Sequence, residues 1–311
     1  MITHILATCL SLVAFLGGLR LMRSGFERMA EGRLAHLIRI AASTPTRGIL
    51  TGAVSTALLQ SSGAVTAITV GLVAAGSLDF ASGLGLVLGA NVGTTVTPQL
   101  LNLNLWGIVL PALAAGLMLS LSPRLERRPL GEGLVGFACL FIALQALAAA
   151  LHPLATAPFF HEALATAGRH ILWAALAGCA LSALVQSSTA TTVIAMALVG
   201  GHMIPLEGGI AISLGANIGT CLTSVIAAIG TPRAAQRIAL AHVLLNSMGV
   251  AAFLPVLHPF ASAVAALSFS PSQAVANANT AFNILCTLAV WPFTRPFARF
   301  LTWMLPDART T

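Results

Sequence analysis

QSS at residues 60–62 and GANVGT at residues 89–94 recur in this chain as QSS at 186–188 and GANIGT at 215–220. The second copy of each motif follows 126 positions after the first, from 60 to 186 and from 89 to 215. The amino acids that repeat are mainly Gly, Ser, Thr, Asn and Gln, inside segments otherwise rich in Ala, Val, Ile and Leu. A repeat that keeps its polar residues predicts a site with two equivalent parts. Repeats with interrupted hydrophobic segments are typical of secondary transporters.

The composition predicts a protein that lies in a lipid bilayer. Hydrophobic residues make up 57% of the 311 residues and charged residues only 7%, whereas about a quarter of the residues of a soluble domain are charged. The net charge of +7 comes from Arg residues that flank apolar stretches, as expected of cytoplasmic loops. We therefore predict an all-α polytopic membrane protein with no nucleic-acid partner.

Apolar stretches in the chain have two different lengths. About 17–25 residues cross a bilayer as one helix, and seven stretches fit this length: residues 2–20, 81–100, 105–121, 131–150, 209–229, 238–257 and 273–292. Residues 48–76 and 174–202, which hold the QSS triplets, each contain 29 residues. This length lies between about 20 residues for one crossing and about 40 for two. Each is therefore predicted to be a re-entrant hairpin of two half-helices.

The distribution of Arg residues supports the two hairpins. If the N-terminus lies outside and both hairpins return to the side they start from, 14 of 15 Arg residues are cytoplasmic and only Arg169 is outside. Three spans then separate the hairpins, and this odd number inverts the second unit relative to the first. We expect a bacterial inner-membrane protein with a cytoplasmic C-terminus.

Each repeat unit is expected to contain a span, a segment along the membrane surface, a hairpin and two further spans. Unit one covers residues 1–122 and unit two covers 129–257, and an additional C-terminal span lies within 271–305. The surface segments are predicted at residues 29–42 and 155–168, the first of them as an amphipathic helix.

The QSS triplets are predicted to form the tips of the hairpins. Ser and Thr are preferred N-caps, and a helix N-terminus binds anions through its unpaired N–H groups and its dipole. Two tips that face each other would make a cavity rich in hydroxyl groups. Alternatively, the hydroxyls only cap half-helices or join packed spans. The candidate ligands are Ser61, Ser62, Ser187, Ser188 and Thr189.

The GANxGT motifs lie late in the span that follows each hairpin. Their glycines are four positions apart and permit close helix packing, but packing does not explain the amides and hydroxyls. Oxygen atoms of amides, hydroxyls and freed carbonyls at a helix break suit an alkali cation, as in transporters that bind sodium at broken helices. The candidate sodium ligands are Asn91, Thr94, Asn217 and Thr220, with Thr66 and Thr192 one turn beyond the tips.

Charged residues are expected to be absent from the site, because no Asp, Glu or Arg falls at the centre of a predicted span. Burying a lone anion costs tens of kcal/mol by Born estimates, and each helix end returns at most about 2 kcal/mol. Cations that enter with the anion would supply the missing charge. His242, with Asn246 one turn further, is either a helix-packing residue or a proton carrier. No nucleophile–base pair, metal cluster or nucleotide loop predicts an enzyme or a cofactor.

These motifs resemble the type II sodium-dependent phosphate cotransporter family in its compact bacterial form. The resemblance covers most of the chain and is most specific in the doubled QSS and GANxGT motifs. It implies an inverted-repeat carrier that moves inorganic phosphate with sodium ions. It places both QSS triplets and the residue after the second around phosphate and its sodium ions: Gln60, Ser61, Ser62, Gln186, Ser187, Ser188 and Thr189. It implies a supporting role for Asn91, Thr94, Asn217 and Thr220.

The chain departs from the family pattern at several positions. Gly63 stands where the family often has Ser, and Asn279 and Asn283 stand where members often read His-x-x-x-Asn. The later spans have no acidic residue, whereas electrogenic animal relatives carry one, so the sodium stoichiometry stays open. No segment similar to the regulator PhoU is expected before Thr311. Two alternative functions stay open: a carrier for a different small anion, and a phosphate-sensing membrane subunit that does not transport. The direction of transport and a homo-oligomeric state are also left open.

Overall fold

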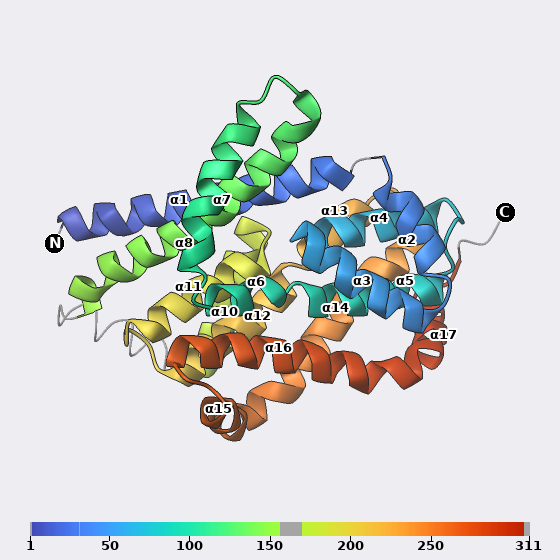
Figure 1. Ribbon diagram of the computed structural model, residues 1–311. Coiled ribbons are helices and arrows are strands. Elements are labelled where there is room, and N and C mark those ends of the chain that lie inside the picture. Colours follow the sequence, from blue (N-terminus) through green and yellow to red (C-terminus); the bar gives the residue numbers. More distant parts are fainter. Residues whose placement is uncertain (1, 31, 156–169, 308–311) are drawn as a thin grey trace.

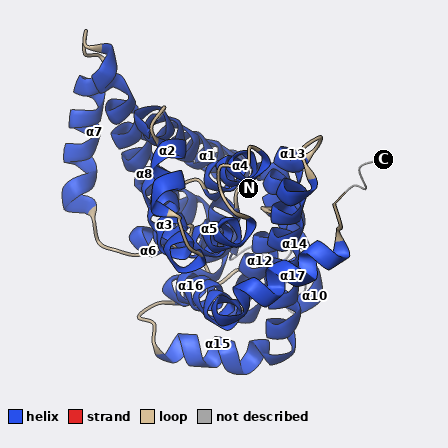
Figure 2. Ribbon diagram, turned by 90° about the vertical axis from the view of Figure 1, so that its right-hand side faces the viewer, coloured by secondary structure: helices blue, strands red, loops and turns tan. Residues whose placement is uncertain are grey.

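The computed structural model describes residues 2–30, 32–155 and 170–307, and within these ranges every regular element is a helix (Figure 2). Six of the helical segments are long and apolar enough to cross a membrane: Thr3–Ala30, Phe80–Leu101, Leu125–Leu151, Leu206–Ala228, Arg233–Ala266 and Pro271–Met304. The prediction of an all-α polytopic membrane protein is confirmed.

Helices in the first part of the chain correspond closely to helices in the second. The first part contains α1 (Ile2–Ala30), α2 (Leu34–Ala41), α3 (Pro45–Leu59), α4 (Ser62–Ala74), α5 (Phe80–Gly93), α6 (Val96–Leu101) and α7 (Trp106–Ser120). The second contains η1 (Leu125–Arg127), α8 (Arg128–Ala155), α10 (Ile171–Val185), α11 (Ser188–Gly200), α12 (Leu206–Gly219), α13 (Leu222–Ala228) and α14 (Arg233–Phe253). The bounds of α3, α4 and α5 recur 126 positions later as those of α10, α11 and α12.

The C-terminal part adds helices that have no counterpart in the first part. They are η2 (Leu254–Val256), α15 (Leu257–Ala266), α16 (Pro271–Val290), η3 (Trp291–Phe293) and α17 (Thr294–Met304). Figure 1 shows α16 and α17 along one side of the molecule, opposite α1 and α8. The additional span expected within residues 271–305 is therefore helical.

Two expected spans differ from the helices observed. The first span was expected to end at residue 20, but α1 continues through Arg20 and Arg23 to Ala30. The span expected at residues 105–121 is the 15-residue helix α7, shorter than the roughly 17 residues that a crossing needs. The expected surface segment at 29–42 contains α2, whereas the second, at 155–168, lies almost wholly outside the described residues.

Glycines allow the helices to approach so closely that backbone touches backbone. A Cβ atom added to Gly89 of α5 would lie 1.9 Å from the carbonyl oxygen of Ile49 in α3. A Cβ added to Gly215 of α12 would lie at the same distance from the carbonyl oxygen of Ala175 in α10. The glycines of both GANxGT motifs therefore have the packing role that the sequence indicates.

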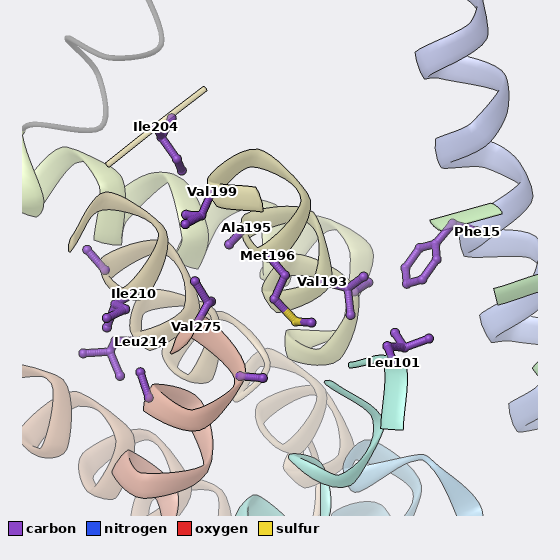
Figure 3. Packing of buried hydrophobic residues seen from close by; sticks show 14 of the residues in the cluster. Phe15, Leu101, Val193, Ala195, Met196, Val199, Ile204, Ile210, Leu214 and Val275 are labelled. Atoms are coloured by element: carbon purple, nitrogen blue, oxygen red, sulfur yellow. The ribbon is translucent and has the colours of Figure 1, made fainter. Parts of the chain in front are cut away.

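An apolar core packs the motif-bearing helices of the second part of the chain against α1, α8 and α16. Phe15 of α1, Leu101 of α6 and Val193 of α11 point toward one another, and Val275 brings α16 into the same cluster (Figure 3). Large apolar side chains are also exposed on the outside of the molecule, among them Trp173 of α10. Lipid chains would cover such a surface.

Candidate functional site

The two QSS triplets break the chain in the same way. Gln60 and Gln186 both adopt the left-handed conformation, with φ of 58° and 54°. The hydroxyl oxygen of Ser61 accepts a hydrogen bond from the N–H of Ala64 at 3.2 Å and caps α4. Ser187 caps α11 through the N–H of Ala190 at 3.1 Å. The predicted N-caps are confirmed, and each helix directs its first-turn N–H groups toward its tip.

Both tips line one cavity of about 380 Å³. A phosphate ion has five heavy atoms, and it fits even if each needs the roughly 30 Å³ that a water molecule has in the liquid. The lining includes most of the predicted ligands and also two charged residues of α1. It consists of Arg23, Glu27, Ser61, Ser62, Gly63, Ala64, Ala67, Thr94, Gln186, Ser187, Ser188, Thr220, Thr223 and Ile226.

Two of the predicted phosphate ligands do not line this cavity. Gln60 turns its side-chain amide back to the carbonyl oxygen of Ala57. Thr189 is buried behind the lining, with its hydroxyl 3.3 Å from that of Thr94. This contact joins the second QSS turn to the GANVGT motif at residues 89–94. At the position equivalent to Thr189, after the first QSS turn, stands Gly63, which has no hydroxyl to offer.

Arg23 contradicts the expectation of a neutral site. Its Nη2 donates a hydrogen bond of 2.9 Å to the hydroxyl oxygen of Ser187, and Glu27 lines the same cavity. Ser187 accepts from both Ala190 and Arg23, so its own O–H stays free to donate. The sequence prediction was wrong because the end of the apolar stretch was taken as the end of the helix. The charged residues at positions 20, 23 and 27 are three and four positions apart, and this spacing indicates that the helix continues and carries them on one face.

A second cavity, of about 570 Å³, lies next to the first. It shares Arg23, Glu27, Ser61, Gln186 and Ser187 with the first cavity. Its other lining residues are Leu16, Leu19, Arg20, Leu184 and Val185. Arg23 therefore stands where the two cavities meet.

Asn91 belongs to a buried hydrogen-bond network and does not line the cavity. Its Oδ1 lies 3.1 Å from Nε2 of His242, and its Nδ2 donates to Oδ1 of Asn246 at 3.3 Å. Nδ1 of His242 lies 2.9 Å from the hydroxyl of Ser224. Both ring nitrogens of His242 thus have partners, which favours the helix-packing interpretation. The sequence singled out His242 and Asn246 but gave no sign of Ser224.

Asn217 makes an analogous contact in the second unit. Its Nδ2 donates to the backbone carbonyl of Ser213 at 2.9 Å and to Oδ1 of Asn279 at 3.3 Å. Asn283 donates to the same Oδ1 at 3.1 Å. The asparagine of each GANxGT motif is therefore bonded to an asparagine of a later helix, Asn246 in α14 or Asn279 in α16.

Of the six candidate sodium ligands, only Thr94 and Thr220 line the cavity. Thr192 is buried, with its hydroxyl 2.8 Å from that of Ser213. Thr66 is buried without a hydrogen-bond partner, because Val87 occupies the position equivalent to Ser213. The described ranges hold no group of three His, Cys, Asp or Glu residues. The oxygen atoms that the lining offers to a cation are therefore those of hydroxyls, amides and carbonyls, together with the single carboxylate of Glu27.

Comparison with known proteins identifies relatives over almost the whole chain. The protein YqeW of Bacillus subtilis (strain 168) is 31% identical over 292 residues, which cover 94% of this chain and 95% of that protein. The putative inorganic phosphate export protein YjbB of Escherichia coli (strain K12) is 28% identical over 300 residues, or 96% of this chain. The match covers only 55% of YjbB, so the chain spans about half of that relative's length.

A third relative shares a shorter stretch. The sodium-dependent phosphate transport protein 2A of Ovis aries is 35% identical over 88 residues, 27% of this chain and 14% of that protein. No solved structure matches the chain significantly. The family model described as Na+/Pi-cotransporter matches twice, over residues 14–149 and 150–288. These two matches together cover most of the sequence, and the chain therefore belongs to the Na+/Pi-cotransporter family, a family of transporters and not of enzymes.

Proposed function

We propose that this protein is a secondary active transporter that moves inorganic phosphate together with sodium ions. The observation that carries the proposal is that two capped hairpin tips line one common cavity. Two helix N-termini converge there with serine hydroxyls, and this combination is suited to an oxyanion. Relatives named for phosphate export and for sodium-dependent phosphate transport agree with this substrate.

Phosphate in this site is held by groups from both hairpins. Ser61 and Ser62 at the start of α4, and Ser187 and Ser188 at the start of α11, provide hydroxyls at the cavity wall. Gln186 adds an amide from the second tip. Gln60 and Thr189 support the tips from behind, through their bonds to Ala57 and Thr94.

Sodium ions bind in this proposal beside the phosphate, where the GANxGT helices end. Thr94 and Thr220 line the cavity at those ends, and their hydroxyls are hard oxygen ligands. Asn91 and Asn217 hold the two helix ends in place through their bonds to Asn246 and Asn279. Thr66 and Thr192 are fully buried and do not line the cavity; the hydroxyl of Thr192 bonds to that of Ser213, while that of Thr66 is left without a partner. Sodium acts as a transported coupling ion in this scheme and not as a resident cofactor.

The orientation that we propose places the N-terminus outside and the C-terminus in the cytoplasm of a bacterial inner membrane. Arg28, near the end of α1, pairs with Glu132 of α8 at 2.5 Å. This contact supports a common side for the Arg groups before the first hairpin and before α8, as two re-entrant hairpins require. Arg237 pairs with Asp307 at 2.8 Å, which supports the same side for the C-terminus. Arg169 and Arg309 lie outside the described residues.

Transport then proceeds by alternating access, with units 1–122 and 129–257 in inverted orientation around the cavity. The matching helix bounds and the double family match support two equivalent units. Inverted repeats of this kind expose a fixed midplane site to either side by rocking one part against the other. The gradients of sodium and phosphate decide whether the protein works in uptake or export.

Radiolabelled phosphate uptake into proteoliposomes tests the proposal. We expect uptake with an inward sodium gradient and little uptake when potassium replaces sodium. Ser61→Ala and Ser187→Ala are each expected to slow uptake at least tenfold. Ser270→Ala is the matched control, because Ser270 caps α16 in the same way, accepting from Gln273 at 3.1 Å, but does not line the cavity. Equal uptake in both salts would exclude sodium coupling. Phosphate binding without any uptake would favour the sensing subunit instead.

A further inference from the structure

One face of α1 carries three charged residues toward the hairpin tips. Arg20, Arg23 and Glu27 follow at three- and four-residue spacing, and all three line the second cavity. Arg23 and Glu27 line the first cavity as well. A charged side chain within a membrane span is costly, and it normally marks a functional site.

Arg23 has hydrogen-bonding capacity to spare. A guanidinium group carries five N–H donors, but the described residues provide one acceptor, the hydroxyl of Ser187 at 2.9 Å from Nη2. The Nε atom of Arg23 is buried and has no hydrogen-bond partner. Glu27 is one turn away on the same helix, yet the two side chains form no ion pair within 4.0 Å among the described residues. The guanidinium group is therefore not directly paired, and the carboxylate of Glu27, which lines the same two cavities, offsets its charge only from a distance.

The fold does not require this charge. The positions equivalent to Arg20, Arg23 and Glu27 in α8, 126 residues later, are Ala146, Ala149 and Pro153. α8 nevertheless forms a helix of almost the same extent, which packs against α1 at Gly18, Gly25 and Gly136. The paired helices thus need small residues where they touch each other, and among the described residues the charges that line the two cavities come from α1.

We propose that Arg23 is a direct phosphate ligand. Its fixed positive charge replaces a positive charge that a bound cation would otherwise have to bring. The guanidinium fork donates to two phosphate oxygens, as Arg does in bidentate phosphate recognition, while the free O–H of Ser187 donates to a third. Arg20 adds a second positive charge in the adjoining cavity. This inference rests on the proposed function. It adds the expectation that the protein keeps part of its affinity for phosphate when sodium is absent.

Calorimetric titration of the purified full-length chain in detergent with potassium phosphate tests the inference, in choline chloride and in sodium chloride. We expect wild-type protein to bind phosphate in both salts and more tightly in sodium. Arg23→Gln removes a charge-assisted hydrogen bond, so it is expected to weaken phosphate binding in choline chloride by roughly 10- to 100-fold. In sodium chloride the same substitution should weaken phosphate binding by a smaller factor. Arg23→Lys keeps the charge but loses the fork, so it should bind in choline with intermediate affinity. Arg39→Gln, which removes an exposed charge from α2, should bind like the wild type.

The outcomes separate this inference from the proposed function. If wild-type protein takes up phosphate with sodium, but Arg23→Gln binds phosphate with unchanged affinity in both salts, only the role of Arg23 is overturned. If wild-type protein neither binds nor transports phosphate, the proposed function fails together with the inference. Gel filtration and circular dichroism check that each variant is folded. If Arg23→Gln does not fold, Arg23→Lys decides, and wild-type affinity in that variant overturns the bidentate contact.

Discussion

The tight contact between α3 and α5 predicts a strong effect of one methyl group. In Gly89→Ala the new Cβ would lie 1.9 Å from the carbonyl oxygen of Ile49, whereas ordinary contact begins near 3.4 Å. The helices must therefore separate by about 1.5 Å, and a gap of 1 Å already loses up to half of the dispersion energy of the contacts it opens. We expect a loss of at least about 3 kcal/mol in stability, at or beyond the upper end for overpacked sites. Gly215→Ala should behave alike.

Thermal unfolding of the purified variants in detergent measures this effect. With about 2–4 °C per kcal/mol, as in folded domains of 150–250 residues, Gly89→Ala is expected to lower Tm by roughly 6–12 °C. Gly71→Ala is the control, since a Cβ there meets nothing within 4 Å and the equivalent position in α11 is Ala197. It should raise stability by up to about 1 kcal/mol through helix propensity. An unchanged Tm for Gly89→Ala would refute the packing argument.

Three further predictions concern the hairpin tips and the buried network. Gly63→Ser should fold, because its Cβ would lie 3.5 Å from Thr223, which is ordinary contact. Its added hydroxyl should lower the KM for phosphate uptake by roughly 2- to 10-fold, and an unchanged KM would contradict this. Thr94→Val and Thr189→Val should show a coupling energy of about 0.5–1.5 kcal/mol in a double-mutant cycle of thermal unfolding, and strict additivity would exclude their hydrogen bond. His242→Gln should lower Tm but keep the pH profile of phosphate uptake, because both ring nitrogens already have partners, whereas a lost pH dependence would make His242 a proton carrier.

Much of the fold followed from residue type and position. Ser61 and Ser187 are N-caps because the hydroxyl oxygen of a serine before a helix accepts a hydrogen bond from an N–H group of the first turn. This bond depends on the local sequence alone. The helical repeat followed in the same way, from glycines and polar residues at one constant offset. Such features need no knowledge of what lies across the cavity.

The contacts between distant segments could not be predicted. The role of Arg23 depends on how far α1 continues beyond the apolar stretch, and a helix ends where its hydrogen bonds end and not where its hydrophobicity falls. Asn91 is polar in either interpretation, and only its three-dimensional neighbours show that it bonds to His242 and Asn246. Gln60 and Gln186 share the left-handed backbone, but the amide of Gln60 bonds back to the carbonyl of Ala57 whereas Gln186 lines the cavity, and the identical triplets do not predict this difference.

In the proposed alternating-access cycle, the hydrogen bond between Arg23 and Ser187 has a consequence for the resting state of the empty protein. In an inverted-repeat transporter the two end states arise when the units exchange conformations, and they have equal energies if the units are identical. Here Ala149 occupies the position equivalent to Arg23, so this bond can form in one arrangement without a mirror-image bond in the other. A hydrogen bond to a charged group contributes about 1.5–3 kcal/mol, which corresponds to a population ratio of roughly 10 to 150. Most molecules of the unloaded protein would then have their site open to the same side of the membrane, and substrate from that side would bind first.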